Sequence, residues 1–320
     1  MKKIMALILV TALLLTGCSS KTYSTIALNF KQSGGDYKLV PDENAANYNQ
    51  LITDLESLNI DLNSDTKVAV LSTSTANLLD NLGLNIVGVT SSKNLNDNLK
   101  EGLEDGTIVD LGSPISPNLE QLTSLDEEII FVGSNMPVQE EYAALDNLVT
   151  LPQVFYYDIF YTVYGLISEF KLGDDAQAVF NQMVITDQMA KDIEKTYTDE
   201  NPSAAVLKYA YGNFTIAPDN TYAGSLATEI KVENIYGDYT DVELPVDMEK
   251  LLLDDPQYII LYGKGDDMQA DVDKLMEDPV FSSLTAAKEG RVVVLESISL
   301  NADIESADTL LQLSTDIYES

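Results

Sequence analysis

Short apolar runs alternate with stretches of helical spacing along most of the chain from Lys67 onwards. The runs are rich in Val, Ile and Leu, which is typical of buried strands, while Ser, Thr, Pro and Gly mark several helix ends. In the first half this pattern predicts strands at 68–71, 86–89, 107–111, 129–132 and 148–151, and helices at 75–82 and 118–125. Such alternation indicates a mostly parallel sheet with helices on both faces.

A long helical region interrupts the alternation, and a second set of elements follows it. Two helical segments, 157–170 and 174–197, succeed each other with no strand between them. Alternation then resumes with predicted strands at 204–209, 214–217, 258–261 and 291–295, and helices at 221–229, 246–253, 266–276 and 304–318. We therefore predict an α/β protein of two Rossmann-like lobes, 66–156 and 201–320, with mostly parallel sheets joined by a long helical link at 157–200.

The N-terminus has the features of an export signal. Two lysines precede an apolar run at 4–15, which is too short to span a bilayer comfortably and ends in Leu15-Thr16-Gly17-Cys18. This ending resembles the lipobox of bacterial lipoproteins, in which the Cys is acylated and becomes the first mature residue. The resemblance implies a signal peptide at 1–17 and a lipid anchor on Cys18. An ordinary signal peptide or a buried helix is the alternative interpretation.

Residues 18–65 are predicted to be a tether and an N-terminal extension. The segment is polar apart from a turn signal at 33–36 and loose helical spacing of apolar residues at 44–58. We expect a hairpin near 26–39 and one helix that packs on the first lobe.

Composition narrows the range of functions. The chain of 320 residues has 18 Lys and Arg against 52 Asp and Glu, and its formal net charge of −34 argues against a nucleic-acid partner. It has no His and one Cys, which excludes a Ser-His-Asp triad, a His-ligated zinc or haem, an internal disulfide and an iron–sulfur cluster. Neither a Gly-x-Ser-x-Gly nor a Walker motif occurs. We expect a binding protein with no intrinsic cofactor, not an enzyme.

Five stretches that follow one another in order share a family pattern. They are 68–72 with 77–89, 110–122 (Asp-Leu-Gly-Ser-Pro-Ile-Ser-Pro-Asn-Leu-Glu-Gln-Leu), 214–217 with 222–226, 248–252 before 255–260, and 290–295. Together they make residues 67–318 resemble the substrate-binding lipoproteins of ABC importers for iron complexes and cobalamin. The resemblance implies two lobes joined by a long helix, capture of a small molecule in the cleft, and delivery to an ABC permease dimer with its ATPase.

Within this family the layout is most similar to haem-receiving lipoproteins of Gram-positive surfaces, which hold haem iron through a Met and a His. Here the Met position is matched by Ile115, and the His position falls at or near Gly263-Lys264. Neither Ile nor Gly can ligate iron, and a Lys does so only when strongly desolvated. A Tyr ligand for a haem-like ring is the alternative, and the candidates are Tyr209, Tyr211, Tyr222, Tyr239 and Tyr262. The metal ligand is left open.

Ligands of two-lobed α/β proteins bind at loops beyond the carboxyl ends of the strands. The corresponding candidates in the first lobe are Ser72, Thr73, Ser113, Ile115, Asn135 and Met136. Those in the second lobe are Tyr209, Tyr211, Phe214, Tyr222, Tyr262 and Lys264. The hydroxyls have an alternative role as helix caps, Met136 as a core residue and the aromatic rings as packing. The run from Phe155 to Tyr164 is interpreted as packing between link and lobe.

Charge also bears on the ligand. Arg291 is the only Arg and opens a strand away from the expected cleft, while Lys208 and Lys264 are the only lysines near it. Carboxylate-rich or catecholate siderophores usually need Arg forks, so this distribution favours a neutral, cationic or mostly apolar ligand.

The resemblance also assigns a role to two glutamates. In the family, one Glu on each lobe docks on Arg residues of the permease, and Glu120 and Glu249 match those positions. A solvated Glu favoured by a helix N-terminus is the alternative.

We predict an extracytoplasmic, lipid-anchored and monomeric solute-binding protein. It captures a haem-like tetrapyrrole, a siderophore or a corrinoid. A non-transporting surface sensor on the same scaffold, or a receptor for a non-iron small molecule, is the alternative.

Overall fold

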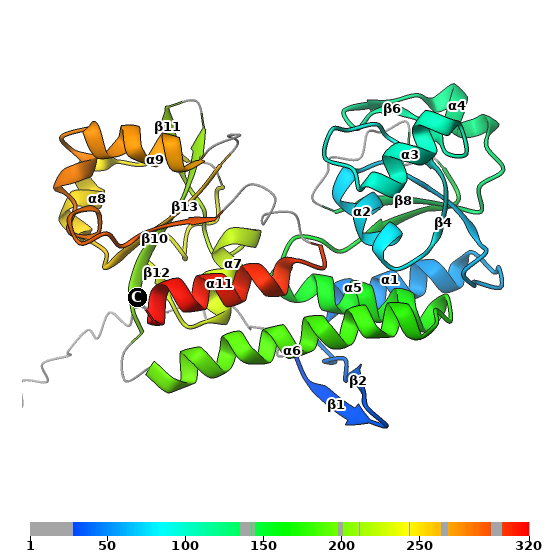
Figure 1. Cartoon of the computed structure of the whole chain (residues 1–320), viewed down its shortest axis with the longest axis horizontal. Coiled ribbons are helices and arrows are strands. Elements are labelled where there is room, and N and C mark those ends of the chain that lie inside the picture. The colour runs from blue at the N-terminus through cyan, green and yellow to red at the C-terminus, as the bar shows by residue number, and fades with distance from the viewer. Residues whose placement is uncertain are drawn as a thin grey trace, which may run out of the picture.

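The structure is a computed structural model (Figure 1) that describes residues 28–134, 142, 145–197, 201–210, 212–242, 244–263, 268–295 and 303–319. Five residues of the predicted sites lie outside the described residues: Cys18, Asn135, Met136, Tyr211 and Lys264. Figure 1 shows two α/β lobes side by side above a layer of helices. The expected fold class is confirmed, because each lobe contains a mainly parallel sheet of five strands.

The N-terminal lobe is built on a fully parallel sheet. Its strands are β3 (Lys67–Val70), β4 (Asn85–Val89), β5 (Val109–Asp110), β8 (Ile129–Gly133) and β9 (Leu148–Leu151), in the order β5-β4-β3-β8-β9. The connecting helices are α2 (Thr73–Asn81), α3 (Asp97–Asp105) and α4 (Leu119–Ser124), and a small antiparallel pair, β6 (Gly112–Ser113) and β7 (Ser116–Pro117), precedes α4. The central strands β3 and β8 are buried on both faces, as their unbroken apolar runs require.

The C-terminal lobe repeats this plan with an antiparallel edge. Strands β10 (Ser203–Ala210), β11 (Asn213–Ile216), β13 (Tyr258–Gly263) and β14 (Val292–Leu295) follow the order β11-β10-β13-β14, and β12 (Glu233–Asn234) also pairs with β10. Only β11 is antiparallel to its neighbour. The helices are α7 (Tyr222–Glu229), α8 (Met248–Asp254), α9 (Met268–Glu277), α10 (Thr285–Lys288) and α11 (Ser306–Tyr318), with a 3₁₀ turn at Phe281–Ser283.

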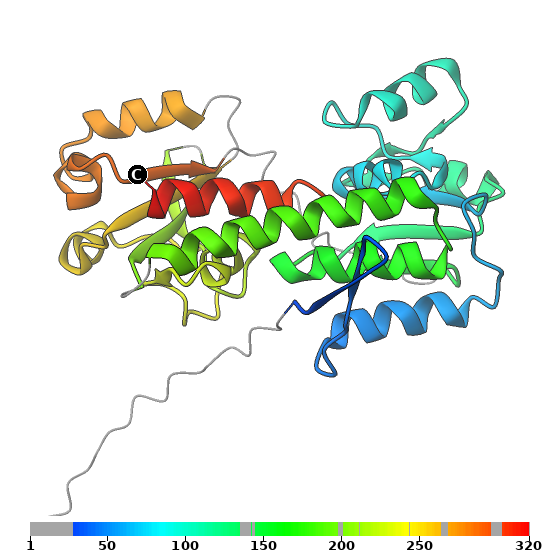
Figure 2. The same cartoon turned by 60° about the horizontal axis from the view of Figure 1, so that its bottom comes forward.

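The helical region between the lobes consists of two helices with different positions. Helix α5 (Tyr156–Glu169) packs against α1 (Ala46–Ser57) under the N-terminal lobe. Helix α6 (Asp174–Tyr197) passes beneath both lobes and packs along α11, as both views show (Figures 1 and 2). At 24 residues α6 is about 36 Å long, which is enough to reach from one lobe to the other.

The N-terminal extension is an ordered part of this helical layer. Strands β1 (Phe30–Ser33) and β2 (Asp36–Leu39) form the expected hairpin, whose two turn glycines both have positive φ angles of 68° and 105°. Phe30 packs its ring against Phe160 and Phe180, and the side chain of Asn181 accepts the backbone N–H of Tyr37. The hairpin is therefore attached to α5 and α6, on the side opposite the open ends of the lobes (Figure 1).

One hydrophobic core runs through both lobes. It joins Val70 of the first sheet, Phe160 and Phe180 of the helical layer, and Val206 and Leu310 of the second lobe, all of them fully buried. Buried polar contacts cross the same region: the Ser225 hydroxyl accepts the backbone N–H of Tyr156 at 3.0 Å. The lobes are consequently fixed to each other at their base, and only their outer ends are separate.

Candidate functional site

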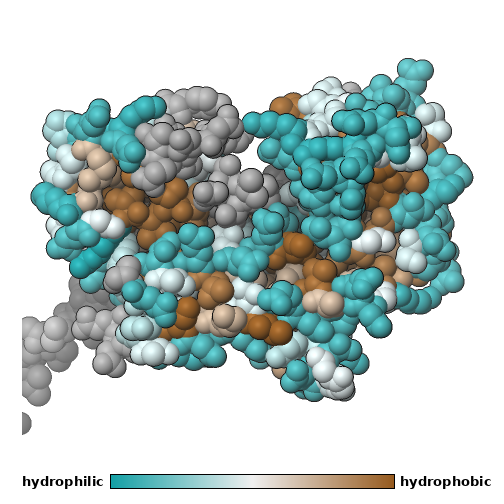
Figure 3. Space-filling view, in the orientation of Figure 1, coloured by the Kyte–Doolittle hydropathy of each residue, from teal (hydrophilic) through white to brown (hydrophobic). Residues whose placement is uncertain are grey.

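The open side of the molecule lies where both sheets end. The carboxyl ends of β3, β8, β10 and β13 point to the region between the lobes, which is the expected binding position in parallel α/β folds. In Figure 3 the surface is hollowed between the two lobes on the side away from α6. This interlobe cleft is the candidate ligand site.

Beneath the first-lobe side of the cleft lies a chain of buried hydrogen bonds. Ser72 donates to the Thr75 hydroxyl at 2.6 Å, and Thr75 donates to the side-chain oxygen of Gln153 at 2.8 Å. The Ser72 oxygen also accepts the backbone N–H of Gly133 at 3.3 Å. The Ser72 side chain therefore does not cap α2, and its hydroxyl proton is already donated within the protein. The neighbouring Thr73 is half-buried. A direct ligand contact by either residue stays a prediction.

The first-lobe candidates Ser113 and Ile115 lie at the turn between β6 and β7, just before α4. The Ser113 hydroxyl accepts the backbone N–H of Ile115 at 3.3 Å, which holds this turn. The Ile115 side chain is 80% exposed, one of the two most exposed large apolar side chains among the described residues. A ligand contact by Ile115 stays a prediction.

Aromatic residues gather on the second-lobe side. The Tyr209 and Phe214 rings are 5.2 Å apart, and Phe214 stacks on Phe281 at 5.7 Å with an interplanar angle of 2°. Both Tyr209 and Phe214 are half-buried against the core of this lobe, so each combines packing with an accessible edge. Phe281 supports the group from a turn that gave no signal in the sequence.

Three further candidate tyrosines have contacts within the protein. The Tyr222 hydroxyl donates to Ser306 at 2.7 Å, and burial raises the pKa of Tyr222 far above its ordinary value. Since iron prefers a phenolate, this environment opposes a role of Tyr222 as an iron ligand. Tyr262 is half-buried on the shared core, and Tyr239 packs edge-on against Tyr236.

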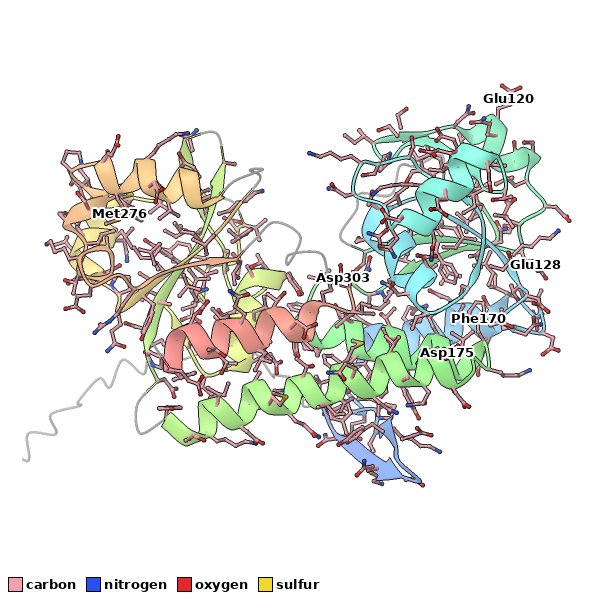
Figure 4. All side chains as sticks on the ribbon, in the orientation of Figure 1. Glu120, Glu128, Phe170, Asp175, Met276 and Asp303 are labelled. Atoms are coloured by element: carbon pink, nitrogen blue, oxygen red, sulfur yellow. The ribbon has the colours of Figure 1, made fainter. Side chains whose placement is uncertain are left out.

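Asp303 is a buried carboxyl between the lobes that sequence reasoning missed. It lies just before α11, between the lobes (Figure 4), and is only 7% exposed. Its carboxylate accepts the backbone N–H of Glu305 at 3.0 Å, while burial raises its pKa to about 7. The only signal in the sequence is an Asp directly before the predicted helix at 304–318, which is an ordinary N-cap position. An N-cap position does not indicate that the Asp303 side chain is buried.

The two predicted docking glutamates occupy equivalent places in the two lobes. Glu120 is the second residue of α4 and Glu249 the second of α8, and both are exposed. The N-cap side chains of Asn118 and Asp247 each accept two backbone N–H groups, including that of the glutamate. Helix α4 leads into β8 and α8 into β13, and each of these strands pairs with the first strand of its sheet. Glu120 lies at the outer end of its lobe (Figure 4).

Other kinds of site find no support in the described part of the chain. Within it, Asp, Glu, His and Cys side chains form no group of three or more that could hold a metal ion. Nor is any helix among the described residues both long and apolar enough to cross a membrane.

Fold and cleft together define a two-lobed binding protein. The family model for periplasmic binding proteins matches residues 68–298, more than half of the chain. The chain therefore belongs to the periplasmic binding protein family, as the sequence resemblance predicted. Members of this family are transport receptors, and the expectation that the chain is not an enzyme is confirmed on this ground.

Solved structures agree with this fold. An ABC transporter substrate-binding protein from Listeria monocytogenes has 18% identity and a TM-score of 0.66, over 80% of this chain and 100% of that chain. The haem complex of IsdE from Staphylococcus aureus has 19% identity and a TM-score of 0.66, over 79% and 99%. The iron-uptake binding protein FeuA from Bacillus subtilis has 16% identity and a TM-score of 0.60, over 91% and 100%. No curated protein matches the sequence.

Proposed function

We propose that this chain is the extracytoplasmic solute-binding lipoprotein of an ABC importer for an iron complex. The cleft between two lobes of a periplasmic binding protein fold is the observation that carries the proposal. The similar solved structures, whose names mention haem and iron uptake, support the ligand class. In this proposal Cys18 carries the lipid anchor, and the mature protein acts as a monomer beside its permease.

The described side chains favour a large, flat ligand of low negative charge. Tyr209 and Phe214 offer ring edges to a planar ligand on one side, and Ile115 offers an aliphatic contact on the other. Arg291, the only Arg, pairs with Glu289 at 2.9 Å at the start of β14, the end opposite the cleft. Without an Arg fork, a carboxylate-rich siderophore is less suitable than a tetrapyrrole or a corrinoid.

An absorption titration of the mature protein tests the ligand class. Haemin is titrated first, then cobalamin and ferric siderophores, and we expect a saturable spectral shift at a 1:1 ratio with one of them. Tyr209→Phe is expected to alter the haemin spectrum if the phenolate ligates iron, whereas Tyr164→Phe, in the helical layer, serves as the matched control. No binding of any of these compounds would contradict an iron complex or corrinoid and favour a non-iron ligand.

Uptake of the bound complex tests the transport role. Glu120→Arg combined with Glu249→Arg is expected to abolish uptake and leave ligand binding intact, because each change opposes a cationic docking residue. Asp175→Arg combined with Glu101→Arg makes the same change of charge on exposed residues elsewhere and controls for it. Undiminished uptake in the first variant would favour the alternative of a non-transporting surface receptor or sensor.

A further inference from the structure

One buried carboxylate differs from the others in how its charge is compensated. Four are buried in the described part of the chain: Asp158, Asp187, Glu194 and Asp303. Each of the first three accepts a side-chain donor, which is Asn47 at 3.1 Å, Lys191 at 2.9 Å and Lys231 at 2.8 Å respectively. Among the described residues Asp303 accepts only backbone N–H groups, including that of Glu305 at 3.0 Å. Its negative charge is therefore the least compensated of the four.

Asp303 is held at the floor of the interlobe cleft. It lies just before α11, between the lobes, and α11 runs along the side of α6 that faces the cleft (Figures 1 and 4). The Ser306 hydroxyl accepts both the backbone N–H of Asp303 at 3.2 Å and the Tyr222 O–H at 2.7 Å. These contacts fix the main chain at Asp303, and 7% of the residue's surface stays accessible. The carboxylate is consequently in place where a ligand would bind.

None of the described neighbours supplies the missing positive charge. The described ionisable groups with an electrostatic effect on Asp303 are Glu305, two residues further on, and Tyr222 on α7, and neither is cationic. Lys191, the buried lysine of the helical layer, already bridges two other carboxylates. Burial, and to a lesser extent the like charge of Glu305, raises the pKa of Asp303 to about 7. The described part of the protein therefore leaves this carboxylate without a counter-ion.

Building on the proposed function, we propose that the transported complex carries a cationic group of the ammonium type, and that Asp303 binds this group at the floor of the cleft. The ligand then supplies the compensation that the carboxylate lacks in the protein. The field of a chain with a net charge of −34 attracts cations to the cleft as well. Asp303 is thus a specificity residue, which selects complexes with a positive side group from the ligand classes of the proposed function.

This role differs from that of an ordinary N-cap in its dependence on pH. A ligand cation pairs only with the ionised carboxylate, so binding below about pH 7 releases a proton from Asp303. The affinity for a cationic complex should therefore rise with pH across this range, whereas that for a neutral complex should not. An N-cap carboxylate contributes to the stability of the fold and has no such effect on ligand affinity.

Ferrioxamine B and its N-acetyl derivative form a matched pair of probes. Both hold ferric iron in three hydroxamate groups, so the metal needs no ligand from the protein, but only the first has a protonated amine. Calorimetric titration of the full mature protein at pH 8 measures the affinity for each, and for haemin and cyanocobalamin, which have no ammonium group. We expect ferrioxamine B to bind most tightly of the four, and roughly tenfold or more above its acetylated form.

Asp303→Asn removes the charge and keeps an oxygen that can accept the N–H of Glu305, so the variant is expected to fold. It should weaken binding of ferrioxamine B roughly thirtyfold at pH 8 and leave that of the acetylated form within about twofold of the wild type. From pH 5.5 to 8 the wild-type affinity for ferrioxamine B should rise roughly tenfold or more, because the amine keeps its proton while Asp303 loses its own. Asp308→Asn, at an exposed carboxylate in the first turn of α11, is the matched control.

Three outcomes would overturn the inference and leave the proposed function standing. Equal affinity for the two ferrioxamines, or tightest binding of haemin or cyanocobalamin, would show that the cleft does not select a cation. Equal loss of both ferrioxamines in Asp303→Asn would assign the residue to the shape of the cleft. A haemin spectrum that changes in Asp303→Asn would make the carboxylate an iron ligand instead. Binding of none of the four complexes would contradict the proposed function itself.

Discussion

Two regions near the lobe junction bury carboxylates in opposite ways. At the base, Asp187 and Glu229 share Lys191, with Nζ–oxygen distances of 2.9 and 3.1 Å, and the Tyr156 hydroxyl donates to Asp187. At the cleft, Asp303 has backbone N–H donors, and no described Lys or Arg pairs with it. Burial would lower the pKa of Lys191, but Glu229 and Asp187 raise it, so this Lys stays charged.

The difference distinguishes a cluster of paired charges from a buried carboxyl that has no described cationic partner. The paired cluster joins α5, α6 and α7, and its charges compensate each other. Asp303 carries a desolvation cost that no described cation offsets, between the lobes where a ligand would bind. An uncompensated ionisable group in a cleft is typical of a functional position rather than a stabilising one. Three measurements test this contrast.

The largest effect is expected from Lys191→Met. Removal of the cation leaves Asp187 and Glu229 buried without their partner, so the free energy of unfolding should fall by roughly 3–5 kcal/mol at pH 7. Urea denaturation measures this loss. Lys195→Met removes an exposed pair with Asp192 on the same helix and should cost less than about 0.5 kcal/mol. Equal losses in the two variants would show that the buried cluster stabilises the fold no more than an exposed ion pair does.

A pH-dependent gain is expected from Asp303→Asn. A carboxyl whose pKa is raised in the folded protein favours folding at low pH, and this contribution is lost as the pH rises from about 4 through about 7. The Asn variant lacks the ionised form, so above pH 8 it should be more stable than the wild type by roughly 2–4 kcal/mol.

Denaturation of the wild type and of Asp303→Asn at pH 4.5, 6 and 8 measures the difference in their free energies of unfolding. Asp175→Asn, at an exposed position of α6 (Figure 4), should show no such dependence. A stability difference for Asp303→Asn that stays constant with pH would mean that the carboxyl does not titrate in this range. The contrast with the base cluster would then disappear.

The smallest effect is expected in the neutral network of the first lobe. Thr75→Val removes a fully buried hydroxyl that links Ser72 to Gln153, and the cost should be about 1–2 kcal/mol. Thr53→Val, at an exposed hydroxyl on α1, should change stability much less. Equal effects would indicate that water replaces the missing hydroxyl. The neutral network would then contribute less to the free energy of unfolding than we infer.

The sequence predicted most strands and the long helices, because their apolar runs are dense and regular. It missed α3, where only Leu99 and Gly102 are buried, and the four-residue helix α10. Short or mainly polar elements carry little periodic signal, and their stability comes from contacts with the rest of the fold.

The site was less predictable than the fold. The positions of Glu120 and Glu249 came from the family pattern, but the partners of the polar candidates did not. Ser306 is 84 residues from Tyr222, and Gln153 is 78 residues from Thr75. Such pairings depend on how the sheets and helices assemble, and no local spacing encodes them. The same is true of the stacking of Phe281 on Phe214.

The core that Val70, Phe180 and Leu310 share has a consequence for how such a receptor can change over evolution. Neither lobe is an independent module, so recombination of one lobe with a foreign partner would break the packing of α6 against α11 as well. New specificity is more readily acquired in the loops at the carboxyl ends of the strands, which lie outside this common core. The same base can then serve receptors for chemically unrelated cargo.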